Sequence, residues 1–259
     1  MPSIIHPSAI VDPKAFIDED VEIGPFCIIG KDVKIAHKTK LHSNVIIDGD
    51  TTIGSGCEIF QFTTIGLPPQ CVQYRNEPTK VIIGNNNLIR EYMSIHRASV
   101  NGDGTTTIGD NNYMMAYVHI AHDCKIGSNT ILSNVASCAG HVQVGDFAVI
   151  GGLTAAHQFS RIGAYAMVGA CSYVNQDIPP YTLASGTRTK LYGLNIVGLK
   201  RQGFSAEKIS ILKKAYRILF MDELKLKDAL IKVETELPQI DEIKILIEFM
   251  KASKRGISQ

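Results

Sequence analysis

Residues 23–59, IGPFCIIGKDVKIAHKTKLHSNVIIDGDTTIGSGCEI, repeat one pattern every six positions, and this repeat decides the fold. An aliphatic residue marks each repeat, and a small or β-branched residue follows four positions later. A period of six matches neither the helical period of about 3.6 residues nor the simple alternation of an ordinary strand. It is typical of a parallel β-helix, in which short strands alternate with tight corners. The marked positions in this stretch are Ile23, Ile29, Ile35, Leu41, Ile47, Ile53 and Ile59.

The same pattern extends outward from this stretch in both directions. It runs from Ile5 to Val174 and is broken by two polar stretches, 67–80 (LPPQCVQYRNEPTK) and 99–107 (SVNGDGTTT). Loops on a rigid scaffold are where specificity tends to lie, so both loops are candidates for substrate recognition.

Alternation along each short strand indicates which side chains point inward. The marked aliphatic residues and the small residues four positions later face the axis, and the residues between them and at the corners face outward. Cys27, Cys57, Cys124 and Cys138 all occupy inward positions. Because a free cysteine behaves there as a small hydrophobic residue, we interpret these four as packing residues rather than nucleophiles.

The pattern changes at about Leu191. Ser205 is the predicted N-cap of a first helix, and apolar residues at helical spacing continue almost to the end of the chain. The predicted helices run to Phe220, from Asp222 to Glu236, and from Asp241 to about Lys254 before Gly256. We therefore predict a mainly β protein with a β-helix over residues 1–190 and a small α-helical domain over residues 191–259.

The composition restricts the classes of function. The 259 residues carry a net charge of +1, are 45% hydrophobic and include no Trp, so nothing indicates nucleic-acid binding. No run approaches the roughly 18 apolar residues of a transmembrane helix, and the N-terminus lacks a signal-peptide pattern, so we expect no integral membrane protein. Six cysteines without a CxxC motif favour reduced thiols and a cytoplasmic location.

Two histidines in the stretch HIAHDC (119–124) face outward on this frame. His119 precedes the inward Ile120, and His122 lies at the following corner. A coil of three repeats stacks each residue against the one 18 positions later, at a spacing of roughly 4.8 Å. Gly140 then stacks on His122 and Gln158 stacks on Gly140. His141 stacks in the same way on Asp123, which is either a solvated corner carboxylate or an orienting group.

Two kinds of chemistry fit the stacked set formed by His119, His122, His141, Gly140 and Gln158. Zinc needs three or four ligands, which His119, His122 and His141 can supply, as in γ-class carbonic anhydrases. Alternatively, an imidazole takes a proton from a hydroxyl near neutral pH, and a glycine N–H stabilises an oxyanion. No outward Ser or Cys lies beside His122, which favours direct transfer from a thioester without a covalent intermediate. Because the zinc-binding proteins space two histidines five apart, we favour the base and expect no metal and no cofactor.

Longer motifs resemble one family across nearly the whole chain. The stretches HIAHDCKIG, AGHVQVGDFAVIGG, TAAHQFSRIGAYAMVG, DIPPYTLASG and GLNIVGLKRQGFS are similar to those of bacterial UDP-N-acetylglucosamine O-acyltransferases. The resemblance implies a left-handed β-helix and a homotrimer with active sites in clefts between subunits. It implies transfer of an (R)-3-hydroxyacyl group from acyl carrier protein to the sugar 3-hydroxyl, the step that opens lipid A biosynthesis.

The resemblance also implies roles for individual residues. His122 matches the general base, and Gly140 matches the residue whose N–H stabilises the oxyanion. The implied substrate-binding positions are Gln70, Gln73, His96, His119, His141, Gln158, Ala170, Asn195 and Arg201. The C-terminal residues from Leu191 carry 13 Lys/Arg against 9 Asp/Glu, which suits docking of an acidic carrier protein or an ordinary solvated helix face.

Three departures from the family pattern affect specificity. The family's first loop reads Q-D-x-K, whereas residues 70–73 read QCVQ, so both charges that hold the sugar are missing. The ordinary sugar remains the favoured acceptor, with a 3-amino analogue or a non-catalytic paralogue as alternatives. Val197 and Gln202 replace common Glu and Arg residues near the nucleotide. Ala170 replaces a Gly found in some members, which predicts a preference for slightly shorter acyl chains.

Overall fold

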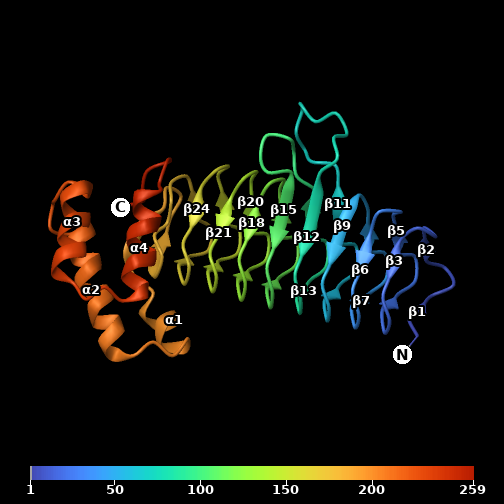
Figure 1. The fold of residues 1–259 in the computed structure, drawn as a ribbon, viewed down its shortest axis with the longest axis horizontal. Coiled ribbons are helices and arrows are strands. Elements are labelled where there is room, and N and C mark those ends of the chain that lie inside the picture. Colours follow the sequence, from blue (N-terminus) through green and yellow to red (C-terminus); the bar gives the residue numbers. More distant parts are fainter. Residues whose placement is uncertain (1) are drawn as a thin grey trace.

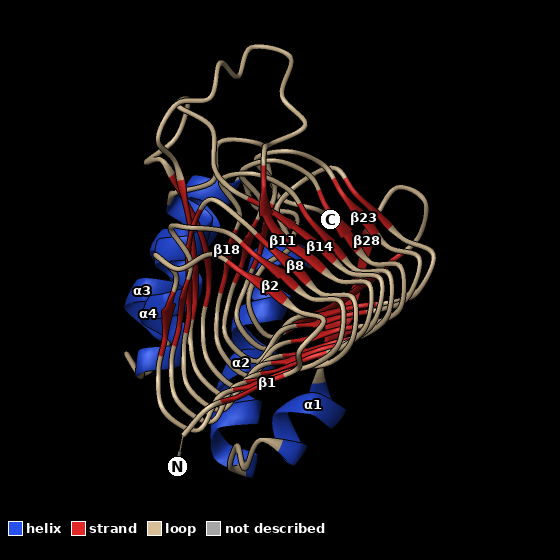
Figure 2. Cartoon of the chain, turned by 90° about the vertical axis from the view of Figure 1, so that its right-hand side faces the viewer, coloured by secondary structure: helices blue, strands red, loops and turns tan. Residues whose placement is uncertain are grey.

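The computed structural model describes residues 2–259 as a left-handed parallel β-helix followed by four helices, confirming the predicted fold class (Figure 1). The coils stack one behind another, and three sheets form the sides of the prism (Figure 2). The first sheet contains β1 (Ile4–Ile5), β4 (Glu22–Ile23), β7 (Lys40–Leu41), β10 (Glu58–Ile59), β13 (Leu88–Ile89), β16 (Tyr113–Met114), β19 (Ile131–Leu132), β22 (Val149–Ile150), β25 (Met167–Val168), β27 (Thr182–Ser185) and the antiparallel β28 (Lys190–Leu194). The second contains β2 (Ile10–Val11), β5 (Ile28–Ile29), β8 (Ile46–Ile47), β11 (Thr64–Leu67), β14 (Ser94–His96), β17 (His119–Ile120), β20 (Ser137–Cys138), β23 (Ala155–Ala156) and β26 (Tyr173–Val174). The third contains β3 (Phe16–Ile17), β6 (Lys34–Ile35), β9 (Asp50–Ile53), β12 (Lys80–Ile83), β15 (Thr105–Ile108), β18 (Lys125–Ile126), β21 (Gln143–Val144) and β24 (Arg161–Ile162).

The pairing of the strands follows the six-residue repeat. Marked residues pair with marked residues one coil away, as in Ile29 with Ile47 and Ile120 with Cys138. Their side chains form one continuous buried core along the axis. The four cysteines predicted to pack inward are buried, and burial raises the pKa of Cys138 to about 12. These thiols therefore stay protonated and pack as small apolar groups.

The two interruptions project from the same side of the β-helix (Figure 1). The first lies between β11 and β12 as predicted, but the second is shorter than predicted and covers residues 97–104. Thr105, Thr106 and Thr107 belong to β15 and pair with β12. The periodic pattern placed them in the loop because the repeat resumes only at Ile108, although their β-branched side chains suit a strand.

The C-terminal helices differ from the prediction at three points. The helix α2 (Ala206–Phe220) begins after its N-cap Ser205 as predicted, whereas α3 (Leu226–Glu236) begins four residues after Asp222. A left-handed backbone at Glu223 (φ 54°) prevents an earlier start. The helix α4 (Asp241–Lys251) ends before Lys254. The short α1 (Ile196–Arg201) was not predicted, because it spans little more than one turn and contains Gly198.

The helices pack on the last coils around a second apolar cluster that includes Tyr181, Leu199 and Leu212. The first sheet continues through β28 to Leu194, so the division of the chain at residue 190 stays a prediction. Within residues 2–259, no helix combines the length and the apolar character needed to cross a membrane.

A buried carboxylate fastens the C-terminal segment to the β-helix. Asp177 is 1% exposed and accepts hydrogen bonds from the Arg161 Nε (3.0 Å) and the Ser253 Oγ (2.8 Å). The Arg161 guanidinium also lies over the Phe249 ring of α4, with 4.1 Å between its Cζ and the ring centroid. These contacts hold the end of α4 and the segment that follows it against the last coil.

Replacing Asp177 with alanine is expected to destabilise the fold by about 3 kcal/mol, because it leaves the Arg161 charge unpaired in a mostly buried place. Chemical denaturation would measure this loss, and hydrogen exchange would show loosening over residues 252–258. The control is Lys244→Ala, which removes an exposed pair with Asp241 and should change stability by less than about 0.5 kcal/mol. Equal effects of the two substitutions would contradict the assignment.

Candidate active site

The corner between the second and third sheets brings several of the predicted site residues together. Asp123, His141 and Phe159 occupy the same place in successive coils, each with a left-handed backbone (φ 62°, 62° and 64°). The His141 N–H donates to the His122 carbonyl (3.0 Å), and the Phe159 N–H donates to the Gly140 carbonyl (3.1 Å). These bonds fix the 18-residue register, so the predicted stacking of Gly140 on His122 and of His141 on Asp123 is confirmed.

Asp123 contacts the ring of His122 directly. The Asp123 Oδ2 lies 2.8 Å from the His122 Nδ1 and 3.7 Å from the His141 Nε2, and Asp123 is 4% exposed. Burial raises the pKa of this carboxyl, but hydrogen bonds from His122 and Ser99 outweigh burial and hold its pKa below the usual value. The residue is therefore an ionised orienting group rather than a solvated corner carboxylate. Its charge favours a proton on Nδ1 and leaves the Nε2 lone pair available.

Gly140 covers the same imidazole from the next coil. A Cβ at Gly140 would lie 2.6 Å from the His122 Cε1 and 2.8 Å from the His122 Nε2, so no side chain fits. Within residues 2–259, the Gly140 N–H has no hydrogen-bond acceptor. A free N–H beside an imidazole is an arrangement that can stabilise a developing oxyanion.

Three further histidines surround this corner. The His119 Nδ1 lies 2.7 Å from the Ser94 Oγ, and the His96 ring meets His119 edge-on with 5.1 Å between centroids. His141 stacks on Phe159 with 4.4 Å between ring centroids. Burial, with smaller effects of His119 and His122, lowers the pKa of His96 to about 4. Burial also lowers the pKa values of His119 and His141, so these three imidazoles are neutral at neutral pH.

The unfolding free energy is expected to fall as the pH drops from about 6.5 to about 4, since unfolded His96 binds a proton that the folded protein excludes. A shift of this size corresponds to about 3 kcal/mol, which is fully present above pH 6.5 and lost by about pH 4. Denaturant melts across this range would measure it. His96→Gln should flatten the dependence, whereas substitution of the exposed His6 should not; identical slopes for both variants would contradict the prediction.

Several predicted substrate-binding residues make no hydrogen bond to His96, His119, His122 or His141 within residues 2–259. One of them, Gln158, lies beside Phe159 in the coil that stacks on Gly140, and its carbonyl lies 3.0 Å from the His157 Nδ1. Asn195 caps α1 by accepting from the Gly198 N–H (3.1 Å) and donates to the Tyr165 carbonyl (3.0 Å). The exposed members of this group are Gln70, Gln73, Gln158, Ala170 and Arg201.

The closest set of potential metal ligands differs from the predicted one. One nitrogen or oxygen each of His122, Asp123 and His141 lies within 4.8 Å of the others, whereas His119 is not part of this group. Within residues 2–259, the trio His119, His122 and His141 therefore does not form a ligand group of this kind in one chain. In this group the Asp123 Oδ2 is already bonded to the His122 Nδ1, so an ion would have to separate them.

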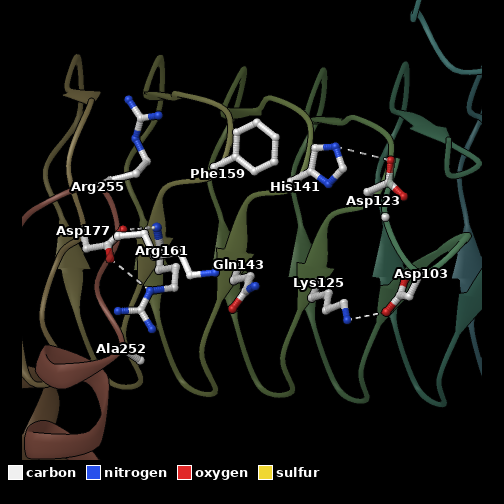
Figure 3. A pocket seen from close by; sticks show the side chains of 12 residues that line it. Asp103, Asp123, Lys125, His141, Gln143, Phe159, Arg161, Asp177, Ala252 and Arg255 are labelled. Atoms are coloured by element: carbon white, nitrogen blue, oxygen red, sulfur yellow. Dashed lines mark hydrogen bonds and ion pairs between the residues drawn. The ribbon is translucent and has the colours of Figure 1, made fainter. Parts of the chain in front are cut away.

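A groove of about 440 Å³ begins at Asp123 and His141 and runs along the third sheet to the C-terminal segment (Figure 3). Lys125 pairs with Asp103 at one end, and Arg161 pairs with Asp177 at the other. The groove therefore connects the His122 corner with the basic C-terminal segment around Arg255.

Comparison with known proteins places the chain in a family. It is 66% identical over 253 residues to an acyl-[acyl-carrier-protein]–UDP-N-acetylglucosamine O-acyltransferase of Thermodesulfovibrio yellowstonii, covering 98% of both chains. The chain belongs to the UDP-N-acetylglucosamine O-acyltransferase family. A relative with the same name from Syntrophobacter fumaroxidans is 51% identical, again over 98% of both chains.

Family models and solved structures agree with this membership. The model of bacterial transferase hexapeptide repeats matches residues 105–135, and that of UDP-N-acetylglucosamine O-acyltransferase domain 2 matches residues 177–258. The LpxA structure from Acinetobacter baumannii superposes with a TM-score of 0.97 at 43% identity, covering 99% of this chain and 100% of that one. The UDP-N-acetylglucosamine acyltransferase from Bacteroides fragilis gives 0.96 at 40% identity with the same coverage.

Sequence reasoning missed the groups that hold the site residues in place. Ser94 and Ser99, which bond His119 and Asp123, were not selected. The insertion at 97–104 shifts the register, so Ser94 pairs with His119 at a separation of 25 residues instead of 18. An 18-residue repeat could not predict this contact, because the two residues are 25 positions apart.

Proposed function

We propose that the chain transfers an (R)-3-hydroxyacyl group from acyl carrier protein to the 3-hydroxyl of UDP-N-acetylglucosamine, the opening step of lipid A biosynthesis, in the cytoplasm. The observation that carries the proposal is the arrangement of Asp123, His122 and Gly140 at one corner. The names of the relatives give the substrates. Membership of this family favours acyl transfer over the carbonic-anhydrase alternative.

In the proposed mechanism, the His122 Nε2 removes the proton of the sugar 3-hydroxyl as its oxygen attacks the thioester carbonyl. The N–H of Gly140 stabilises the oxyanion of the tetrahedral intermediate. The intermediate collapses, the C–S bond breaks, and the thiol of the carrier's prosthetic group leaves with the proton held by His122. The Asp123 carboxylate stabilises the imidazolium that exists between these two proton transfers.

We propose that the site is completed by a homotrimer. Gln70, Gln73 and Arg201 are exposed in one chain, as expected for groups that meet substrate in a cleft between subunits. His96, His119, His141 and Gln158 then position the acceptor and the acyl group.

In this proposal, Arg201 and Asn195, at the two ends of α1, bind the nucleotide part of the acceptor. Arg201 suits the diphosphate because a guanidinium donates two parallel hydrogen bonds. The Asn195 side chain already makes two bonds within its own chain, so its part in binding would require exchanging one of them.

An exposed apolar corner supports the trimer. Phe62, Tyr92 and Tyr117 stack along the corner between the first and second sheets, with 5.0 and 4.9 Å between successive ring centroids. All three are about half exposed. Contiguous exposed apolar surface of this kind marks protein–protein contact sites.

An acyl-transfer assay with purified hydroxyacyl carrier proteins tests the function. UDP-N-acetylglucosamine and its 3-amino analogue should be compared as acceptors, since Cys71 and Gln73 replace the charges that hold the sugar in the family. Faster transfer to the amino sugar would select the alternative acceptor, and no transfer to either would favour a non-catalytic paralogue.

Ala170 should set a slightly short acyl optimum, because its methyl takes roughly the depth of one methylene, worth about 0.8 kcal/mol. The residue is exposed in one chain, so the effect requires the neighbouring subunit to close the groove. We expect Ala170→Gly to lengthen the preferred chain in a series of acyl carrier proteins. An unchanged optimum would contradict this prediction.

A further inference from the structure

The loop between β14 and β15 reaches back to Asp123. The Ser99 Oγ donates to the Asp123 Oδ2 (2.7 Å), and the Ser99 backbone N–H donates to the same oxygen (3.0 Å). Ser99 is 1% exposed and Asp123 is 4% exposed, so water does not compete strongly for these bonds. The break in the repeat thus delivers two donors to the carboxylate that orients His122.

The direction of the Ser99 hydroxyl is fixed by its own neighbour. The Asn101 N–H donates to the Ser99 Oγ (3.3 Å), so the hydroxyl hydrogen is left to point at Asp123. With the His122 Nδ1, three donors therefore converge on Oδ2. The other oxygen, Oδ1, is buried and has no hydrogen-bond partner within residues 2–259.

Gly102 closes the opposite side of the carboxylate. A Cβ at Gly102 would lie 2.5 Å from the Asp123 Oδ1, so any side chain there would push against this oxygen. A change of the Asp123 rotamer that moved this oxygen position away from His122 would also break the bonds from Ser99. The loop therefore holds one rotamer of Asp123 from both sides.

We propose that the loop 97–104 is a clamp for the base, in which Ser99 and Gly102 are positioning residues that act on His122 through Asp123. The proposal rests on the proposed function, because it assigns the clamp to the general base of that reaction. A residue that only satisfied a buried carboxylate would affect folding stability and leave the turnover of the folded enzyme unchanged.

Ser99→Ala removes the hydroxyl donor and keeps the backbone donor. We expect kcat to fall about tenfold, the factor of one hydrogen bond to a charged group, with KM for the acceptor unchanged. Ser99→Thr keeps a hydroxyl and should restore most of kcat. Val100→Ala, at the exposed neighbouring position, is the matched control and should leave kcat at the wild-type value. Wild-type kcat in Ser99→Ala would overturn the proposal.

A double-mutant cycle with Asp123→Ala separates positioning from a general effect of the loop. Ser99→Ala and Gly102→Ala should each lower kcat alone, and neither should lower it further once Asp123 is alanine. An equal loss in both backgrounds would refute the proposal. Gly102→Ala acts on Oδ1 without touching Ser99, so the test survives if Ser99→Ala folds poorly. His122→Ala, assayed in parallel, reports separately on the proposed function: full activity there would refute the base itself.

Discussion

His122→Ala is expected to lower kcat by about 10³-fold, because the substitution removes the group that takes the proton from the attacking hydroxyl. The neighbouring histidines do not replace it: His119 bonds to Ser94, and His141 stacks on Phe159. KM for the acceptor should change little, since the lost interaction belongs to the transition state. Steady-state assays with the acyl carrier protein substrate would measure both constants.

The substitution should leave the fold and the oligomer intact. His122 lies at an outward corner, 17% exposed, and the marked core residues on either side of it remain. Circular dichroism and light scattering would confirm this. His157→Ala, a half-buried histidine two coils away that directly follows β23, would serve as a comparison. A variant that retains more than about one tenth of kcat would show that another group is the base.

The fold was predictable because one physical rule governs most of the chain. Each inward position must be filled by an aliphatic or small side chain at a fixed spacing, so the repeat specifies strands, corners and register together. The rule also gave the stacking of Gly140 on His122. It failed where residues leave the repeat. Thr105 begins a strand inside a predicted loop, and Ser99 bonds Asp123 from a loop that does not follow the repeat.

The site was predictable in position but not in its hydrogen bonding. The six-residue repeat predicted that Asp123 lies at the corner. Only the structure shows that its Oδ2 bonds the His122 Nδ1 and that the carboxyl is almost completely buried. Burial of a corner residue depends on the loop that folds over it, which is non-local information. The same limit applies to the groups expected from a neighbouring subunit, since one chain does not contain them.

Gly140→Ala is expected to lower kcat by about 10²- to 10³-fold, the range for loss of one oxyanion donor. The backbone at Gly140 is not left-handed, so alanine is tolerated conformationally and the effect comes from contact alone. The new Cβ would lie 2.6 Å from the His122 Cε1, so either the ring leaves Asp123 or the Gly140 N–H shifts from the oxyanion. Either displacement removes a group that the proposed transition state requires.

Contact with the His122 ring can be tested as the cause of this loss. In a His122→Ala background the ring is absent, so Gly140→Ala should lower kcat no further. Gly152→Ala is the matched control, because its Cβ would meet the Asn134 carbonyl at 3.2 Å and no ring. Acceptor binding, measured by calorimetry, should survive in both glycine variants. If Gly140→Ala keeps kcat within about threefold of wild type, the close approach of glycine to imidazole serves packing, and the oxyanion donor must lie elsewhere in the cleft.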